Sequence, residues 1–156
     1  MNIDEMEAGR ELDALVAEKV MGWVQQEYAD SLGYWCCHRT KEMYPDSSDE
    51  WLKKYPLEMT GWGVSGDWSD EEIPDLIFAL GAKGIWNPSR SYGIAAAMQA
   101  LDEFSTPFRI TCDSLSVNVQ LTMRKEKHTY DVFGYGNGFD ELPLAISRAL
   151  LKAVTE

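Results

Sequence analysis

The segment from Pro88 to Gly93 carries the side chains best suited to binding a small anion. It supplies two hydroxyls and a guanidinium at the predicted start of a helix, where free backbone N–H groups can hold a phosphate or carboxylate. Nearby Trp86 and Tyr92 add aromatic surface on which a base could stack. An ordinary helix cap followed by a solvated arginine is the simpler alternative. The candidate ligand-binding residues are Trp86, Ser89, Arg90, Ser91 and Tyr92.

A second group of candidate residues lies in the stretch 28–87, which holds five of the six tryptophans. Large aromatic rings anchor protein interfaces and can also wall a ligand pocket. The alternative is that these rings form a second small core beneath long loops. Acidic residues lie among the rings, so we expect a negative, aromatic partner-binding surface. Its candidate residues are Trp51, Trp62, Trp68, Asp67, Asp70, Glu71 and Glu72.

The reactive residue types form no recognisable catalytic or metal-binding pattern. Cys36 and Cys37 are adjacent and lack the C-x-x-C spacing that wraps a zinc ion, so reduced thiols are expected. His38 and His128 have no serine or cysteine partner in a known arrangement. Paired carboxylates do acid–base work only where a pocket separates their pKa values, and solvated charge is the simpler reading. We therefore expect no catalytic residue, no metal and no cofactor.

The charge balance restricts the class of partner. With 26 acidic and 14 basic residues, the formal net charge is −12, which disfavours general binding to DNA or RNA. The same charge favours encounter with a basic partner, although solubility alone would also explain it. Charged residues break every apolar stretch, so no membrane span is expected. The first residues show no basic region followed by an apolar run, which predicts a cytoplasmic protein.

Hydrophobic periodicity predicts the elements that would position these residues. An amphipathic helix is expected over 4–23, with Leu12, Leu15, Val16, Val20 and Trp23 on one face. The stretch 28–87 shows no sustained period and is predicted to be irregular, apart from a strand at 34–40 and a short helix at 73–80. A further helix is predicted over 91–104, where Ile94, Ala97, Met98, Leu101 and Phe104 share a face.

The last third of the chain predicts a sheet followed by a helix. Apolar and polar residues alternate over 108–112, 115–123 and 129–133, which indicates three antiparallel strands with short connections. The glycines of 134–138 are expected to form a flexible loop, after which Asp140 caps a final helix. Its apolar stripe is Ile146, Ala149, Leu150 and Ala153. The predicted fold is α+β: an antiparallel sheet of three or more strands with helices packed on it, like an α/β/α sandwich. One domain would span 1–156, with an irregular aromatic-rich insertion at 28–87.

Three stretches, taken in this order, resemble the phage ABA-sandwich domain family of small phage and prophage proteins. They are ELDALVAEKVMGW (11–23), NPSRSYGIAAAMQALDEF (87–104) and ELPLAISRALLKA (141–153). The chain departs from that family at Ser91-Tyr92-Gly93, where an acidic residue is frequent, and in its long tryptophan-rich insertion. The resemblance implies helices layered on a sheet and a phage protein in the cytoplasm of a bacterial host. It implies no reaction.

These observations lead to two functional hypotheses. The favoured one is a non-catalytic phage accessory protein that binds a host protein through the acidic aromatic surface, as a counter-defence inhibitor. The alternative is a sponge that sequesters a small nucleotide signal, with Arg90 on the phosphate and Trp86 or Tyr92 stacked on the base. An enzyme built on a carboxylate pair is the least favoured. Self-association through aromatic loops or a short sheet edge is compatible with both leading hypotheses.

Overall fold

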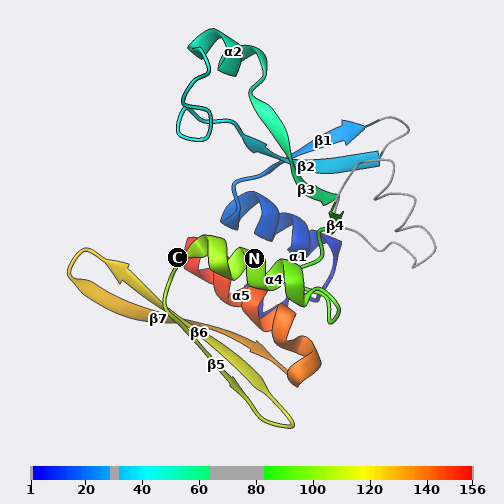
Figure 1. Ribbon diagram of the computed structural model, residues 1–156. Helices are drawn as coiled ribbons and strands as arrows, with labels where there is room; N and C mark the ends of the chain where they lie inside the picture. Colours follow the sequence, from blue (N-terminus) through cyan, green and yellow to red (C-terminus); the bar gives the residue numbers. More distant parts are fainter. Residues whose placement is uncertain (1, 29–31, 64–82, 156) are drawn as a thin grey trace. The chain divides into compact units, whose positions relative to one another are not determined.

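The computed structural model describes residues 2–28, 32–63 and 83–155, and the α+β prediction is confirmed (Figure 1). Contacts divide these residues into two compact units. The first unit comprises residues 2–21 and 86–155, and the second comprises 22–63 and 83–85. The prediction of one domain over 1–156 stays a prediction. Within the described residues, no helix has the length and apolar character that a membrane span requires.

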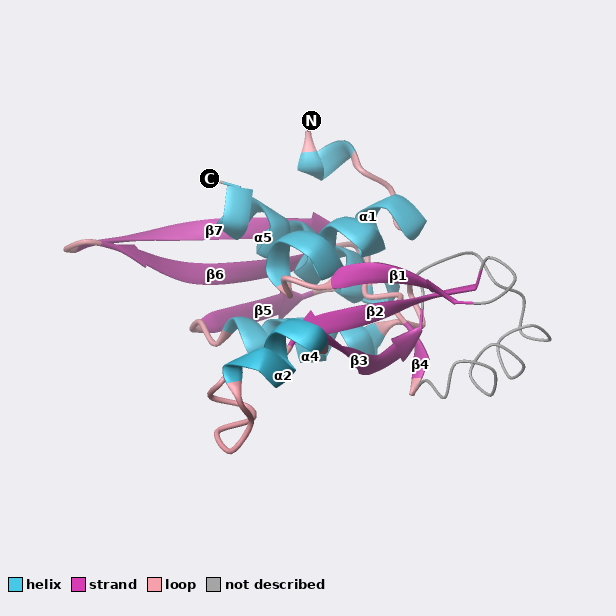
Figure 2. Cartoon of the chain, turned by 90° about the horizontal axis from the view of Figure 1, so that it is seen from above, coloured by secondary structure: helices cyan, strands magenta, loops and turns pink. Residues whose placement is uncertain are grey.

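The first unit contains the predicted three-stranded meander. Strands β5 (Phe108–Cys112), β6 (Val117–Lys125) and β7 (His128–Gly136) are antiparallel and lie side by side in that order (Figures 1 and 2). Alternate residues of β6 are buried, as expected for a strand with one covered face. The covering element is helix α5 (Leu142–Thr155), which packs on β6 and β7.

Helix α5 forms the centre of the first unit. Its predicted apolar stripe is confirmed, since Ile146, Ala149, Leu150 and Ala153 are all buried. Helix α4 (Ile94–Phe104) packs against α5, but the predicted face of α4 is partly wrong. Ile94 and Met98 are 41% and 39% exposed, and the buried face is Ala96, Ala97, Ala100 and Leu101. Small alanine side chains allow the two helices to approach closely.

The predicted helix over 4–23 is interrupted. The chain forms a 3-10 turn at Ile3–Glu5, helix α1 at Arg10–Leu15 and a π-helical turn at Val16–Val20. Gly9 is extended between the turn and α1, and its N–H donates to Ser89 Oγ at 3.0 Å. Met6 O accepts a hydrogen bond from Arg148 Nη2 at 2.7 Å, which holds this segment on α5. Tertiary hydrogen bonds therefore replace the first turns of the expected helix.

The predicted glycine loop over 134–138 is also partly wrong. Gly134 and Gly136 lie among the last three residues of β7, where α5 packs on the strand at close range. A Cβ atom at Gly134 would lie 1.9 Å from Ala145 O of α5. The predicted cap is displaced as well, because Asp140 lies inside a 3-10 turn, Phe139–Glu141, that precedes α5.

The second unit is far more regular than the predicted insertion. Strands β1 (Val24–Tyr28), β2 (Leu32–His38), β3 (Leu57–Gly63) and β4 (Gly84–Ile85) form a sheet in that order (Figure 2). The first three are antiparallel, and β4 runs parallel to β3. The predicted strand at 34–40 is confirmed in shifted form as β2. Neighbouring Trp35 and Cys36 are both buried, so the alternation that reveals a half-buried strand is missing. The predicted helix at 73–80 lies outside the described residues.

Candidate functional site

An aromatic cluster lies in the chain segment between β2 and β3, with two half-buried and two exposed members. We define the aromatic cluster as Arg39, Tyr44, Trp51 and Tyr55. Trp51 lies in helix α2 (Asp49–Lys54), and Tyr55 follows directly after the end of that helix. Since the two residues are four positions apart, their rings lie on the same side of the helix, with centroids 5.6 Å apart. The Tyr44 ring also lies 5.6 Å from the Trp51 ring, measured between centroids. The Arg39 guanidinium carbon lies 5.2 Å from the Trp51 centroid and 5.8 Å from that of Tyr44, within cation–π range.

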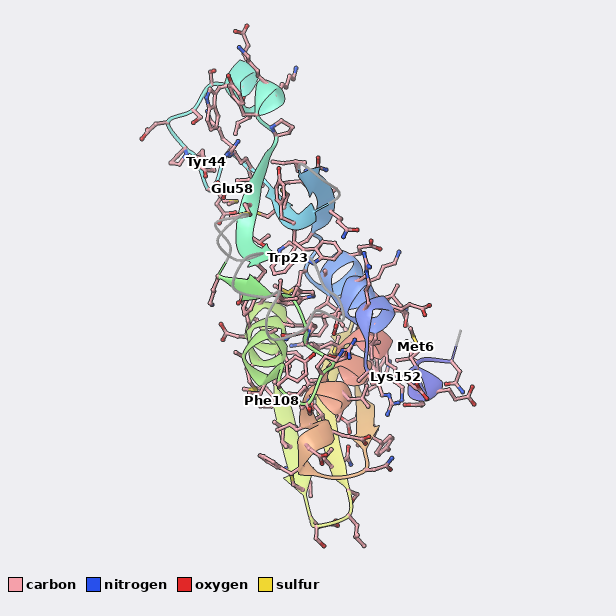
Figure 3. All side chains as sticks on the ribbon, turned by 90° about the vertical axis from the view of Figure 1, so that its right-hand side faces the viewer. Met6, Trp23, Tyr44, Glu58, Phe108 and Lys152 are labelled. Carbon is pink, nitrogen blue, oxygen red and sulfur yellow. The ribbon has the colours of Figure 1, made fainter. Side chains whose placement is uncertain are left out.

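Glu58 of β3 fixes the geometry of the aromatic cluster. Its Oε2 lies 3.4 Å from Arg39 Nε and also accepts a hydrogen bond from the Tyr44 hydroxyl (Figure 3). The hydrogen bond to Glu58 raises the pKa of Tyr44, which therefore stays a neutral donor. Arg39 Nη1 also donates to Tyr55 O at 3.0 Å. The arginine and the tyrosine are therefore held in place before any partner binds.

The tryptophans of the second unit divide between surface and core. Trp51 is 36% exposed and Tyr55 is 45% exposed, whereas Trp62 is only 6% exposed and has Lys83 Nζ at 4.8 Å from its ring centroid. The prediction that Trp62 belongs to a partner-binding surface is therefore wrong, and for Trp35 and Trp62 the core alternative holds. The other predicted partner-binding residues, Asp67, Trp68, Asp70, Glu71 and Glu72, lie outside the described residues. Arg39, Tyr44 and Tyr55 were not predicted, although the spacing of Trp51 and Tyr55 on one helical face would have indicated a pair.

The predicted ligand-binding residues gather in a cavity of about 640 Å³ in the first unit. Four of the five predicted side chains line it: Ser89, Arg90, Ser91 and Tyr92. Trp86 does not, since it is fully buried and its indole Nε1 donates to Asp13 O at 2.9 Å. The prediction that Trp86 stacks on a ligand is therefore wrong. The remaining lining residues are Glu5, Glu7, Ala8, Asn137, Asp140, Glu141, Leu144 and Arg148.

The cavity lacks the predicted anion site at a helix start. Helix α4 begins at Ile94, three residues later than predicted, and Gly93 N already donates to Arg90 O at 2.8 Å. Ser89 is 1% exposed, and its hydroxyl accepts the Gly9 N–H at 3.0 Å. Ser89 therefore joins this loop to the start of α1, so its hydroxyl is already committed to the protein.

The charges around the cavity are mixed. Two arginines face four carboxylates, so the lining is net negative: Arg90 and Arg148 against Glu5, Glu7, Asp140 and Glu141. Arg148 is already committed to the protein, because its Nη1 and Nη2 donate to Tyr135 O and Met6 O at 2.8 and 2.7 Å. A multiply charged phosphate would meet repulsion here, whereas a ligand that carries charges of both signs would not.

Asp13 is a buried carboxyl with an unusually high pKa. Desolvation by burial is the main cause, and it raises the pKa of Asp13 to about 6. Its Oδ1 accepts the Ser89 N–H at 2.7 Å, and the side chain is fully buried. Asp13 does not line the cavity. Because its Oδ1 binds the Ser89 N–H, we assign the carboxyl a role in joining α1 to the 86–89 segment.

The cysteines do not form a nucleophilic site in the described residues. Burial raises the pKa of the Cys36 and Cys37 thiols, which keeps both protonated near neutral pH and weakens them as nucleophiles. Cys112 is exposed on β5. Across the described ranges, no group of histidine, cysteine and acidic side chains could hold a metal ion.

The chain matches no protein-family model, no curated protein and no solved structure. The resemblance to the phage ABA-sandwich family therefore stays an expectation.

Proposed function

We propose that this protein acts by binding a protein partner through the aromatic cluster and carries out no reaction. The observation that carries the proposal is a tryptophan and a tyrosine held exposed beside an anchored arginine. Tryptophan, tyrosine and arginine are the residue types that contribute most to binding at protein interfaces. Because Glu58 and Tyr55 O already orient Arg39, little conformational freedom would be lost on binding.

The partner that best fits this surface is a protein with a basic face. Exposed Asp46, Asp49 and Glu50 border Trp51 along the chain, and the whole protein carries a net charge of −12. Such a charge speeds encounter with a basic partner, especially at low ionic strength. Lys53 and Lys54 place positive charge at the opposite end of α2, so we assign the partner's basic side chains to the Asp46–Glu50 end. The phage setting and a counter-defence role rest on the resemblance alone, and they make a protein of the bacterial host the first partner to test.

Replacing Trp51 with alanine is expected to weaken partner binding by roughly 30-fold, the effect of losing about 2 kcal/mol at an interface anchor. Wild type, Trp51→Ala and Phe139→Ala would be compared by quantitative affinity purification from host cells. Each host protein captured in this way would then be purified and titrated against the three proteins at two salt concentrations. Phe139 is a matched control because it is a large, 70% exposed aromatic residue in the other unit.

The proposal requires a partner that binds the wild type and Phe139→Ala but not Trp51→Ala. The affinity of that partner for the wild type must also fall as the salt concentration rises. If the titrated affinities of all three proteins agree within a factor of two, the aromatic cluster does not bind that partner. Thermal unfolding of Trp51→Ala would show whether the variant keeps the stability of the wild type, so that loss of binding is not mistaken for loss of structure.

The nucleotide-sponge alternative rests on the cavity that brings Ser89, Arg90, Ser91 and Tyr92 together. Its net negative lining disfavours this alternative, so we expect no thermal stabilisation by mono-, di- or cyclic nucleotides at millimolar concentration. A bound nucleotide at a hundredfold excess over its dissociation constant would instead stabilise the fold by about 2.7 kcal/mol, a shift of several degrees in Tm. Such a shift, if abolished in Arg90→Ala and retained in Arg109→Ala, would reverse the ranking of the two functions.

A further inference from the structure

The two edges of the β5–β6–β7 sheet are treated differently by the chain. Along β7, Phe133 O accepts a hydrogen bond from Lys152 Nζ and Tyr135 O accepts one from Arg148 Nη1, each at 2.8 Å. Both cationic side chains come from α5, and they occupy carbonyl groups that a further strand would need. Charged side chains at a sheet edge are a common protection against pairing with another chain. The β7 edge is therefore blocked at Phe133 and Tyr135.

In the part of the chain that the structure describes, no side chain of another element occupies the outward carbonyl groups of β5, although β5 carries one charged side chain, Arg109. Among the described strands, β5 pairs with β6 alone. Pro107 O accepts the Thr122 N–H and Asp113 N donates to Ser116 O, each at 2.9 Å, so the odd-numbered residues of this segment direct their backbone groups toward β6. In an antiparallel ladder this direction alternates along the strand. The N–H and C=O groups of Phe108, Ile110 and Cys112 therefore point away from β6, where a further strand could bind them.

The side chains along this edge are apolar and incompletely covered. Phe108, Ile110 and Cys112 lie opposite Leu121, Val119 and Val117 of β6, so they belong to the face that α5 covers farther along the sheet. The three β6 residues are buried, whereas Phe108, labelled in Figure 3, is 48% exposed, and Cys112 is also exposed. A bare strand edge and uncovered apolar side chains thus coincide on β5.

We propose that β5 pairs antiparallel with β5 of a second copy of this chain, centred on Ile110, which joins two three-stranded sheets into one of six strands. In this register Ile110 faces its own counterpart, and Phe108 faces Cys112. The two uncovered apolar rows then become one continuous row. The contact is self-complementary, as a twofold symmetric interface requires.

Charge also favours this register. On the opposite face of the strand, Arg109 of one copy faces Thr111 of the other, and its two diagonal neighbours in that copy are Asp113 and Arg109. Diagonal pairs on one face of an antiparallel ladder lie about 7 to 8 Å apart at their backbones, within reach of a long side chain. Asp113 is negatively charged, because hydrogen bonds from the backbone N–H groups of Leu115 and Ser116 lower its pKa. The twofold axis forms the attractive Arg109–Asp113 pair twice and the repulsive Arg109–Arg109 pair once, so attraction outweighs repulsion on this face.

The net charge gives the proposal a distinctive salt dependence. Two copies that each carry a charge of −12 repel one another, and added salt screens that repulsion. The β5 interface itself is mainly apolar and hydrogen-bonded, and its exposed Arg109–Asp113 pairs contribute little, so salt weakens it little. The dimer should therefore tighten as ionic strength rises, whereas the proposed binding of a basic partner should weaken.

Sedimentation equilibrium at increasing salt would test the pairing. Wild type is expected to form a dimer, and Ile110→Lys is expected to raise the dissociation constant at least tenfold, because an ammonium group would lie against its own counterpart across the axis. Leu115→Lys is the matched control, since Leu115 is 80% exposed in the β5–β6 turn and lies off the paired segment. A wild type that stays monomeric at all salt concentrations would overturn the proposal.

A cross-linking experiment tests the register without relying on the lysine variant. In a Cys112→Ser background, Ile110→Cys should form a disulfide-linked dimer on mild oxidation, because directly opposite residues in a hydrogen-bonded antiparallel pair lie about 5.5 Å apart at Cα, within disulfide range. Thr111→Cys in the same background should not, since Thr111 faces Arg109 of the second copy. Equal cross-linking of the two variants, or none in Ile110→Cys, would contradict the pairing.

Discussion

Gly134→Ala is expected to destabilise the protein by about 3 to 5 kcal/mol, a large part of the 5 to 15 kcal/mol by which domains of this kind are usually stable. The added Cβ would lie 1.9 Å from Ala145 O, 2.6 Å from Ala149 N and 2.9 Å from Ala149 Cβ. Two of these three neighbours are backbone atoms of α5, so a side-chain rotation cannot relieve the clash. Helix α5 would have to move away from β7, and the buried contacts on both sides of α5 would loosen.

Urea unfolding followed by circular dichroism would measure this loss, with Gly9→Ala as the control. A Cβ atom at Gly9 meets only Arg90 Nη2, at an ordinary 3.6 Å, and the backbone there is extended. We expect Gly9→Ala to change the free energy of unfolding by less than about 0.5 kcal/mol. If Gly134→Ala also changes the free energy of unfolding by less than about 1 kcal/mol, then α5 does not pack on β7 at this distance.

The sequence predicts those elements whose side chains reveal a single buried face. The β5–β6–β7 meander and α5 follow from alternation and from the stripe that includes Ile146 and Leu150, and both are confirmed. Side-chain patterns mislead where the backbone and small residues decide the packing. Gly134 resembles a loop residue, yet it lies in a strand because α5 leaves no room for a side chain. On α4, alanines rather than Met98 form the buried face, since close helix packing favours the smaller residue.

The candidate sites were predictable to a similar degree. Ser89 to Tyr92 do line one cavity, because they are adjacent in a single loop. Nothing in their sequence indicates that Glu5, Glu7 and Glu141 also reach that cavity, since this depends on how the N-terminal segment docks on α5. The aromatic cluster joins Arg39 at the end of β2 to Glu58 in β3, and only the register of that strand pair brings them together.

Asp13→Asn is expected to remove a pH dependence worth about 3 kcal/mol in total from the stability of the protein. The folded-state pKa of Asp13 is about 6, against 3.8 for an unburied aspartate, and desolvation by burial is the main cause. Between these two values the folded protein holds a proton that the unfolded chain has released. The free energy of unfolding therefore falls as the pH rises from about 4 to 6, and the full loss is present above pH 6.

The measurement is the free energy of unfolding by urea at pH 4.5 and at pH 7.5. This carboxyl should make the wild type about 2 kcal/mol more stable at the lower pH, a gain that Asp13→Asn should lack. Asp102→Asn is the control, because it removes the same charge from an exposed position on α4 and leaves burial unchanged.

The asparagine of Asp13→Asn retains an oxygen to accept the Ser89 N–H, but it places an amide where Oδ2 has no hydrogen-bond partner among the described atoms. At pH 7.5 the free energy of unfolding of Asp13→Asn should therefore exceed that of the wild type by only about 1 to 2 kcal/mol. A wild type and an Asp13→Asn variant with the same pH dependence would show that the Asp13 carboxyl is not desolvated in the folded protein.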